Sequence, residues 1–456
     1  MGVVEVPARS TPVFAEVDVV VLGGGPAGIA AATSAARHGA HTLLVERYGF
    51  LGGMGTAAGV TNFCGLHANV HGTIRRVVHG VADDLLGRMH ALGGLNEPHL
   101  VFGKILAQAY DTAAFKCAAD GLLLDAGAEM LLHAVAVGVV KRDDGAIDAL
   151  LVETKSGRVA VRGRTFIDCS GDGDLAHFAG VPMAGGPDAG MLYPTLMFRV
   201  GNVDAVRAGE AWKTIPERMA AAVAAGEFVF PRRGAIVRPQ KHPTEWRVNV
   251  TQLRNADGSA VDGTDARSLS AGEVEGRRQA VDYLRFLRAR VPGFEDAYVL
   301  EIAPQIGIRE TRRLLGEATL TADDVLGCAS VDDAIGVNGW PLELHVAGDV
   351  EWRWPPIPES RGYNQLPWRM LLPRRATAGG ALNLLLAGRC ASMTHDGHSA
   401  ARVSGPCFVM GQAAGTAAAM SLQGGVSLHD LDPAALQAAL RHDGAWLGDE
   451  RALPGP

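Results

Sequence analysis

The apolar positions near the start of the chain form two short runs separated by a stretch of small residues. Residues 18–22 read DVVVL and residues 42–45 read TLLV, and such uninterrupted runs are typical of strands buried on both faces. Residues 29–39 read IAAATSAARHG, an alanine-rich segment that ends in glycine, as helices commonly do. The pattern therefore predicts a parallel strand–helix–strand unit with a right-handed crossover.

Further along the chain, the pattern predicts helices and then strands. Residues 65–125 favour largely helical structure, interrupted by glycine and proline. Residues 130–166 change to short β-like runs that are separated by turn residues. We predict three antiparallel strands here, followed by a return to the main sheet at residues 165–169.

These elements predict an α/β fold with two domains. Residues 185–375 are mixed and punctuated by proline and glycine, whereas residues 383–422 return to a glycine- and alanine-rich strand-and-helix pattern. We therefore expect a discontinuous first domain, residues 14–190 and 375–445, with a parallel sheet and a three-stranded antiparallel hairpin sheet. A mixed α+β substrate domain, residues 191–374, is expected between its two parts.

Composition and charge exclude several kinds of partner. Of the 456 residues, 48% are hydrophobic and 20% charged, so a large buried core is available. A net charge of −7 argues against nucleic acid or an anionic membrane as the partner. The N-terminus lacks signal-peptide features, and no apolar run is long enough to span a bilayer. The six cysteines form no CxxC pair or zinc-like spacing, so we expect a soluble cytoplasmic protein without a metal site.

The turn after the first predicted strand is rich in glycine. Residues 23–28 read GGGPAG, which fits the GxGxxG fingerprint and lies between a predicted strand and a predicted helix. The glycines allow close approach of a pyrophosphate, and the helix directs its first N–H groups at the phosphates. Glu46 follows Gly28 by 18 positions, near the spacing expected for the acid that holds the ribose hydroxyls. The cofactor contacts assigned here are Gly23, Gly25, Pro26, Ala27, Gly28, Glu46 and Arg47.

A second glycine-rich loop follows this acid. It contains Gly53, Met54, Gly55 and Thr56, where a long cofactor would need further backbone contact. No second GxGxxG stands between strand and helix patterns, so the sequence offers no separate NAD(P)H domain. The carboxylate at position 46 also disfavours a 2′-phosphate. One long cofactor contacted by several distant segments indicates FAD.

The end of the chain adds another strand and helix. Residues 384–388 form an apolar run, and Arg389 stands at its carboxyl end, where open α/β sheets place ligands. Residues 411–415 read GQAAG and open or continue an alanine-rich helix, whose N–H groups can face flavin N1 and O2. The cofactor contacts assigned in this segment are Gly388, Arg389, Gly411, Ala413 and Ala414.

Four segments together resemble the FAD-dependent oxidoreductase family related to the two-dinucleotide-binding-domain flavoproteins. They are residues 19–56, residues 166–176 (FIDCSGDGDLA), residues 309–345 and residues 383–420, in the order found in that family. The resemblance implies a Rossmann-like FAD-binding domain. It also implies cofactor contacts near the adenosine and pyrophosphate at Val135, Gly171 and Asp172.

The same resemblance places the loop of residues 394–402 beside the flavin ring. It implies acid–base roles for His395 and His398 and substrate anchoring by Arg402, because histidine titrates near neutrality and arginine binds carboxylates with two donors. Packing is an alternative role for His398, and His67 or Tyr363 are the next candidates for proton transfer. In the inserted domain, the arginines at positions 309 and 312 are predicted on one helix, where salt bridges are an alternative to substrate binding.

The predicted reaction is hydride transfer between flavin N5 and the carbon of a small polar or anionic molecule. Two alternatives stay open: a non-redox isomerase, hydratase or lyase that uses reduced FAD, and a FAD-carrying electron-transfer subunit. Halogenation or monooxygenation ranks lower, since residues 352–358 match GWxWxIP only superficially. The sequence leaves homo-oligomer formation open and identifies neither the substrate nor the electron acceptor.

Overall fold

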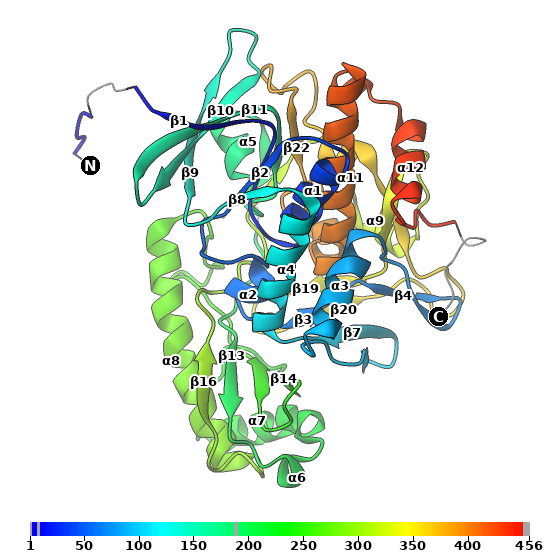
Figure 1. Ribbon diagram of the computed structural model, residues 1–456. Helices are drawn as coiled ribbons and strands as arrows, with labels where there is room; N and C mark the ends of the chain where they lie inside the picture. The colour runs from blue at the N-terminus through cyan, green and yellow to red at the C-terminus, as the bar shows by residue number, and fades with distance from the viewer. Residues whose placement is uncertain (1, 7–9, 187–189, 450–456) are drawn as a thin grey trace.

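A seven-stranded sheet forms the centre of the larger lobe (Figure 1). The structure is a computed structural model that describes residues 2–6, 10–186 and 190–449. Neighbouring strands follow the order β8 (Glu129–Leu131), β2 (Thr42–Val45), β1 (Val13–Leu22), β11 (Gly157–Asp168), β10 (Ile147–Thr154) and β9 (Val135–Lys141). The seventh strand, β22 (Leu384–Leu386), pairs with the last residues of β11.

The strand pairing confirms the predicted parallel unit. β1 runs parallel to β2 and to β11, and α1 (Pro26–Arg37) connects β1 to β2. β9, β10 and β11 are antiparallel, as the turn-separated runs predicted, and they continue the main sheet. Because β22 joins the same sheet, residues from both ends of the chain build this lobe.

Both faces of the sheet are buried. Val19 belongs to the hydrophobic core on one face, and Val20 belongs to the core on the other, because side chains alternate along a strand. α5 (Asp174–Phe178) packs on the second face. The first face is covered by α1, α3 (Val81–Ala91), α4 (Thr112–Ala126) and α11 (Ser404–Gly424).

Helices α1 and α11, distant in the sequence, are in close contact. A Cβ atom at Gly411 would lie 2.0 Å from the carbonyl oxygen of Ala27, and one at Gly415 would lie 2.1 Å from that of Ala31. Glycines four residues apart share one face of a helix, so bare backbone of α11 meets the backbone of α1. The GQAAG segment, residues 411–415, therefore forms the contact between α1 and α11 in the larger lobe.

We expect Gly411→Ala to lower the free energy of unfolding by about 1–3 kcal/mol, because its added methyl group overpacks a contact that only backbone movement can relieve. Urea unfolding of the cofactor-saturated protein measures the change. Gly424→Ala is the matched control, since a Cβ there would meet only the Val426 side chain at 3.7 Å, an ordinary contact. Equal destabilisation by both substitutions would contradict the close-contact explanation.

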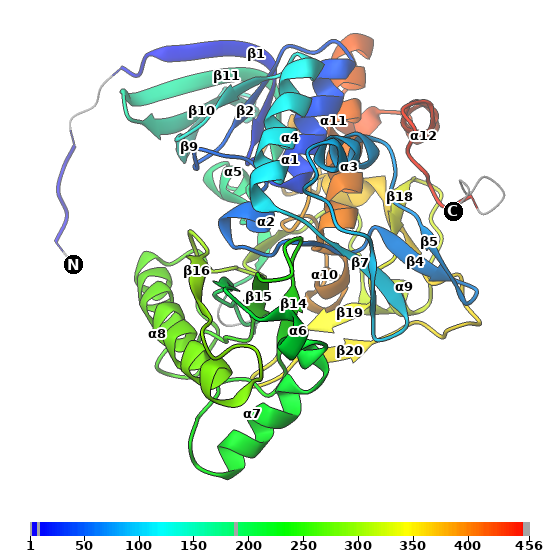
Figure 2. The same ribbon diagram turned by 60° about the horizontal axis from the view of Figure 1, so that its bottom comes forward.

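A smaller lobe is inserted between the two parts of the larger one (Figure 2). Its hydrophobic core uses residues 196–308, whereas residues 320–372 of the predicted substrate domain belong to the core of the larger lobe. The lobe with its own core is thus shorter than the predicted range 191–374. Its antiparallel sheet has the order β14 (Ile236–Pro239), β15 (Trp246–Asn249), β13 (Phe198–Gly201) and β16 (Tyr298–Ile302). Its helices are α6 (Ala205–Ala208), η2 (Ala211–Lys213), α7 (Ile215–Ala224) and α8 (Ala266–Arg290).

Two predictions of secondary structure are wrong. Residues 65–125 contain four strands besides α3 and α4, and these strands pair with their neighbours as short hairpins. Arg309 and Arg312 do not share a helix, because β17 (Arg312–Leu314) pairs with β12 (Met183–Gly185). Long-range strand pairing overrides local helix preference at both places. The four strands are β4 (His67–Val70), β5 (Thr73–Arg76), β6 (His99–Val101) and β7 (Ile105–Ala109).

The remaining elements complete the larger lobe. They are α2 (Met54–Ala57), β3 (Asn62–Phe63), α9 (Ala322–Leu326), β18 (Ala334–Asn338), β19 (Leu342–Leu344), β20 (Glu351–Arg353), β21 (Asn364–Pro367), η3 (Trp368–Leu371), α10 (His395–Ala401), η4 (Leu428–Asp430) and α12 (Pro433–His442). Within residues 2–6, 10–186 and 190–449, no helix combines the length and apolar character needed to cross a membrane. The same residues hold no group of three or more histidine, cysteine or acidic side chains suited to a metal ion.

His67 on β4 is expected to make stability depend on pH. Burial, together with the charges of Arg76 and His79, lowers its pKa to about 4. A histidine whose pKa falls on folding binds fewer protons in the native state, so its contribution is full above about pH 6.5 and is lost as the pH falls towards 4. We expect His67→Gln to lose less stability than the parent protein between pH 7 and pH 5, measured by urea unfolding. An unchanged pH dependence would assign the effect to other groups.

Candidate active site

One continuous cavity extends from the larger lobe to the smaller lobe. At one end, the glycine loop after β1 and the residues after β2 line it. At the other end, residues of β14 and β15 form the wall. The first end lies at the carboxyl ends of parallel strands, which is where open α/β sheets bind ligands.

The glycine loop at the first end is shaped as a backbone cradle. Gly23 has a φ of +99°, and a Cβ atom there would lie 2.4 Å from the carbonyl oxygen of Cys169. A Cβ atom at Gly28 would lie 1.7 Å from the carbonyl oxygen of Gly23. No side chain caps the N-terminus of α1 at Gly25, so the first N–H groups of the helix remain open to an anion. The loop fits the pyrophosphate of a dinucleotide.

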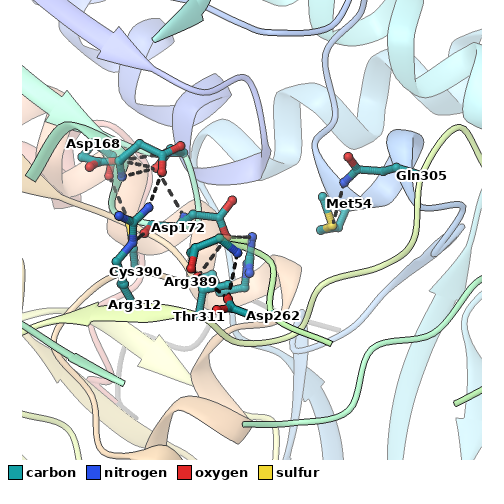
Figure 3. A network of polar contacts seen from close by, with 12 residues as sticks. Met54, Asp168, Asp172, Asp262, Gln305, Thr311, Arg312, Arg389 and Cys390 are labelled. Carbon is teal, nitrogen blue, oxygen red and sulfur yellow. Dashed lines mark hydrogen bonds and ion pairs between the residues drawn. The ribbon is translucent and has the colours of Figure 1, made fainter. Parts of the chain in front are cut away.

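Arg389 brings a positive charge to the same end of the cavity. Its Nη2 lies 2.9 Å from Oδ1 of Asp172, and the hydroxyl of Thr311 donates to the same oxygen at 2.9 Å (Figure 3). Its Nη1 is buried without a hydrogen-bond partner. An unpaired guanidinium nitrogen beside a backbone cradle favours an anionic ligand, because a buried donor without a partner is costly.

Glu46 follows β2 directly and lines the cavity with its buried side chain. Its Oε2 accepts a hydrogen bond from the backbone N–H of Gly24 at 2.6 Å, and its Oε1 accepts one from that of Tyr48 at 3.0 Å. Burial raises the pKa of this carboxyl group, and the two backbone hydrogen bonds oppose the rise. The side chain is thus fixed where the fingerprint expects the ribose-binding acid.

Most residues predicted for the cofactor line this cavity. They are Gly23, Gly25, Pro26, Ala27, Glu46, Arg47, Gly53, Met54, Gly55, Val135, Gly171, Gly388 and Arg389. Six others lie outside the lining: Gly28, Thr56, Asp172, Gly411, Ala413 and Ala414. Gly28 shapes the loop, Thr56 donates to the carbonyl of Leu51 at 2.7 Å, and Asp172 positions Arg389.

The start of α11, rather than its GQAAG segment, reaches the cavity. The helix begins at Ser404, so Gly411 lies seven residues inside it, in the contact with α1. Ser404 and Cys407 of the first turn line the cavity. The positive end of the helix dipole therefore faces the ligand earlier in the chain than the sequence pattern placed it.

Two strands of the smaller lobe line the far end of the cavity, here called the chamber. Ile236 and Arg238 of β14, together with Arg247 and Asn249 of β15, face the chamber. The residues between them, such as Val248, point into the core of the smaller lobe. This alternation follows from the pleat of the strands. The side chain of Arg247 is buried and donates to the carbonyl oxygen of Val60 through Nη1.

A histidine–carboxylate pair and two further arginines complete the chamber. His345 Nε2 lies 3.1 Å from Glu343 Oε1, and Arg402 Nη2 lies 3.9 Å from Glu343 Oε2. Arg309 is fixed by donation from its Nε to the carbonyl oxygen of Tyr193 at 2.9 Å. In the chamber, four arginines therefore face one glutamate: Arg238, Arg247, Arg309 and Arg402.

The charge states of the histidine–carboxylate pair follow from these neighbours. Burial lowers the pKa of His345 well below its usual range, and the charge of Arg309 lowers it further. For Glu343, burial acts upward, but hydrogen bonding to His345 and the nearby positive charges of Arg402 and Arg309 lower its pKa. The chamber thus holds an ionised carboxylate bonded to a neutral imidazole.

Aromatic residues form another part of the chamber wall. Trp340 donates from Nε1 to Glu343 Oε2 at 3.0 Å, and its ring packs edge-on against Trp352 at 5.9 Å between centroids. Phe102, at the tip of the β6–β7 hairpin, packs edge-on against Trp352 at 5.1 Å. All three side chains line the cavity. This combination of apolar wall and convergent polar groups is typical of small-molecule sites.

Of the three predicted catalytic residues, only Arg402 lines the cavity; His395 and His398 are absent from its lining among the described residues. His395 Nδ1 lies 2.8 Å from Glu310 Oε2, and this hydrogen bond raises its pKa. His398 is fully buried in α10, and burial lowers its pKa well below the usual range. Of the alternatives, neither His67 nor Tyr363 lines the cavity.

Sequence reasoning missed several chamber residues. Glu343 was not singled out, although Glu343 and His345 stand two residues apart at a strand, which places them on one side. Arg238 and Arg247 were also missed. The alternation in residues 236–239 (IVRP) and 246–249 (WRVN) could have indicated strands with one polar face.

Comparison with known protein families identifies the chain. The family of FAD dependent oxidoreductases matches residues 18–440, and the protein belongs to this family. It is a FAD-dependent enzyme. The cradle, Glu46 and Arg389 line one end of the cavity and are the residues that we expect to hold the cofactor. This confirms the family, the enzyme class and the cofactor inferred from the sequence.

The solved structures that match this chain are distant from it in sequence. A geranylgeranyl bacteriochlorophyll reductase-like protein from Thermoplasma acidophilum is 14% identical, with 94% of this chain and 82% of that chain covered and a TM-score of 0.44. The p-nitrophenol 4-monooxygenase from Pseudomonas putida is 13% identical, with 96% and 90% covered and a TM-score of 0.48. No curated protein matches the chain.

Proposed function

We propose that this oxidoreductase transfers a hydride between flavin N5 and a carbon atom of a small anionic organic acid. The observation that carries the proposal is the excess of arginine over carboxylate in a chamber continuous with the cofactor end. Buried cations require partners, and a carboxylate supplies both negative charge and paired acceptors. FAD supplies the hydride acceptor or donor when bound.

Arg309 and Arg402 are the groups we assign to holding the substrate next to the histidine–carboxylate pair. Nη2 of Arg309 and both Nε and Nη2 of Arg402 have no hydrogen-bond partner. Because Arg309 is already fixed through its Nε, its remaining donors are oriented in advance. Trp340 and Trp352 provide an apolar surface for the carbon skeleton.

We assign proton transfer to Nδ1 of His345. Its Nε2 is bonded to Glu343, which leaves Nδ1 as the second ring nitrogen. A neutral imidazole oriented by a carboxylate can accept the proton of a substrate hydroxyl or amine as the hydride leaves. The ionised Glu343 then stabilises the imidazolium that forms.

The test is reduction of the protein-bound flavin under anaerobic conditions. After saturation with FAD, the purified protein is expected to show a flavin spectrum that hydroxy acids or amino acids bleach. Alcohols and amines of the same carbon skeleton, which lack the carboxylate, serve as matched controls and are expected to bleach it poorly. Bleaching by the uncharged compounds alone would contradict the proposal. Turnover without consumption of an electron acceptor would instead support non-redox use of reduced FAD.

A further inference from the structure

The four arginines of the chamber form two pairs from two parts of the fold. Arg238 on β14 and Arg247 on β15 are directly opposite one another in the antiparallel register. Arg309 precedes β17, and Arg402 follows the last turn of α10. Arg309 and Arg402 both line the chamber, and the positive charge of Arg402 adds to the effect of burial in lowering the pKa of Arg309.

Each pair concentrates positive charge that the protein itself leaves unsatisfied. Like charges directly opposite on antiparallel strands repel one another, and Arg247 is only 5% exposed. Nη1 of Arg238, Nε of Arg247 and Nη2 of Arg309 have no hydrogen-bond partner. Glu343, the carboxylate of the chamber, is already bonded to His345 and Trp340. It also pairs with Arg402 at 3.9 Å, but one carboxylate cannot balance four guanidinium groups, so the chamber as a whole is short of anions.

Glu343 compensates part of this positive charge, since it lines the same chamber and pairs with Arg402. Cys64 lines the same cavity, where the negative charge of Glu343 and the positive charges of Arg247 and Arg402 all act on it. Burial, the largest effect, raises the pKa of Cys64 to about 12, so the thiol is neutral. Asn62 and Trp340 also line this part of the cavity. Apart from Glu343, the chamber therefore offers positive charge in two places and neutral side chains beside it.

We propose that the substrate is an organic acid with two anionic groups, one held by Arg238 and Arg247 and the other by Arg309 and Arg402. This inference rests on the proposed function and adds the substrate class, a dicarboxylate or an equivalent dianion. The second pair holds its acidic group beside His345, so the reacting carbon lies next to that group. A substrate with one acidic group leaves the other pair without a partner.

Binding to the FAD-loaded protein tests the proposal without turnover. Calorimetry compares malonate, succinate and glutarate, which are dicarboxylic acids of increasing length, and the aromatic diacid phthalate with their monomethyl esters. At least one diacid is expected to bind about 10- to 100-fold more tightly than its own ester, because the ester loses one charge-assisted contact. The best diacid should also raise the melting temperature of the protein more than its ester does.

Substitutions in each pair then distinguish a chamber with two anion subsites from a chamber with one shared anion site. Arg247→Gln and Arg402→Gln are each expected to weaken binding of the best diacid by about 10- to 100-fold. Its monoester occupies one subsite and should be sensitive to only one of the two changes. Arg285→Gln controls for the loss of one positive charge, because Arg285 lies on α8 with its side chain 72% exposed; this variant should bind like the parent.

The outcomes separate this inference from the proposed function. If monoacids bleach the flavin and bind as tightly as diacids, the two-subsite inference is overturned. The proposed function still holds in that case. Equal sensitivity of diacid and monoester to both substitutions would also overturn the two-subsite inference, since one shared anion site would explain that result. Failure of every diacid to bind the FAD-loaded protein at millimolar concentration would overturn it directly. Failure of any acid to bleach the flavin would instead count against the proposed function.

Discussion

His345→Gln is expected to slow flavin reduction by the substrate about 10²- to 10⁴-fold, the usual contribution of general acid–base catalysis. Glutamine can retain a hydrogen bond to Glu343 but cannot take up the proton at the position of Nδ1. FAD should remain bound, because His345 lies in the chamber and not in the glycine cradle. Anaerobic stopped-flow measurement of flavin bleaching at saturating substrate gives the rate of reduction independently of how tightly the substrate binds.

His395→Gln is the matched control for this experiment. The side chain of His395 is paired with Glu310 outside the cavity lining, so we expect bleaching near the rate of the parent protein. The family resemblance assigned the proton to His395, and the two substitutions therefore separate the two assignments. If flavin reduction is slow in His395→Gln and normal in His345→Gln, His395 is the residue that transfers the proton.

Glu46→Gln is expected to weaken FAD binding by about 1.5–3 kcal/mol, the value of a hydrogen bond to a charged group. Substitution removes the carboxylate that the ribose hydroxyls would bond and also weakens its bond to the N–H of Gly24. Titration of the apoprotein with FAD, followed by flavin fluorescence, measures the affinity.

The rate of bleaching at saturating FAD is the second measurement on Glu46→Gln. It should stay near that of the parent protein, because Glu46 lies at the opposite end of the cavity from the chamber. Glu153→Gln offers a surface control, since Glu153 pairs with Arg158 on the hairpin of β10 and β11. Unchanged FAD affinity in Glu46→Gln would show that Glu46 shapes the loop but does not bind the cofactor.

The features predicted correctly are those that depend on residues close together in the sequence. The strand at residues 18–22, the glycine turn and the following helix form one local unit, and Glu46 follows at a recognisable spacing. The short hairpins of β4 to β7 were missed because three- to five-residue strands gain their stability from partners and surrounding packing, not from local preference. The alternating burial of β7 agrees with its sequence ILAQA, so part of that signal was present.

The chamber was harder to predict because it depends on contacts between distant segments. Arg247 becomes a cavity residue only when β15 pairs with β14 and the smaller lobe closes over β3. His395 and Arg402 lie in one short segment, yet α10 directs only Arg402 into the cavity. A motif can thus identify the right loop while the helix geometry decides which side chain reaches the ligand.

The contact between α1 and α11 has a consequence for how the protein is made. At ribosomal rates of about 5–20 residues per second, α1 is synthesised roughly 20–70 s before α11 begins. During that interval the alanine-rich surface of α1 lacks its partner, and β11 lacks β22. Arg389, Ser404 and Cys407 of the cavity lining are also still to be made, so the cofactor site is incomplete on the nascent chain. Insertion of FAD is a late step that follows synthesis of the C-terminal helix, and chains stalled before residue 404 should retain no flavin.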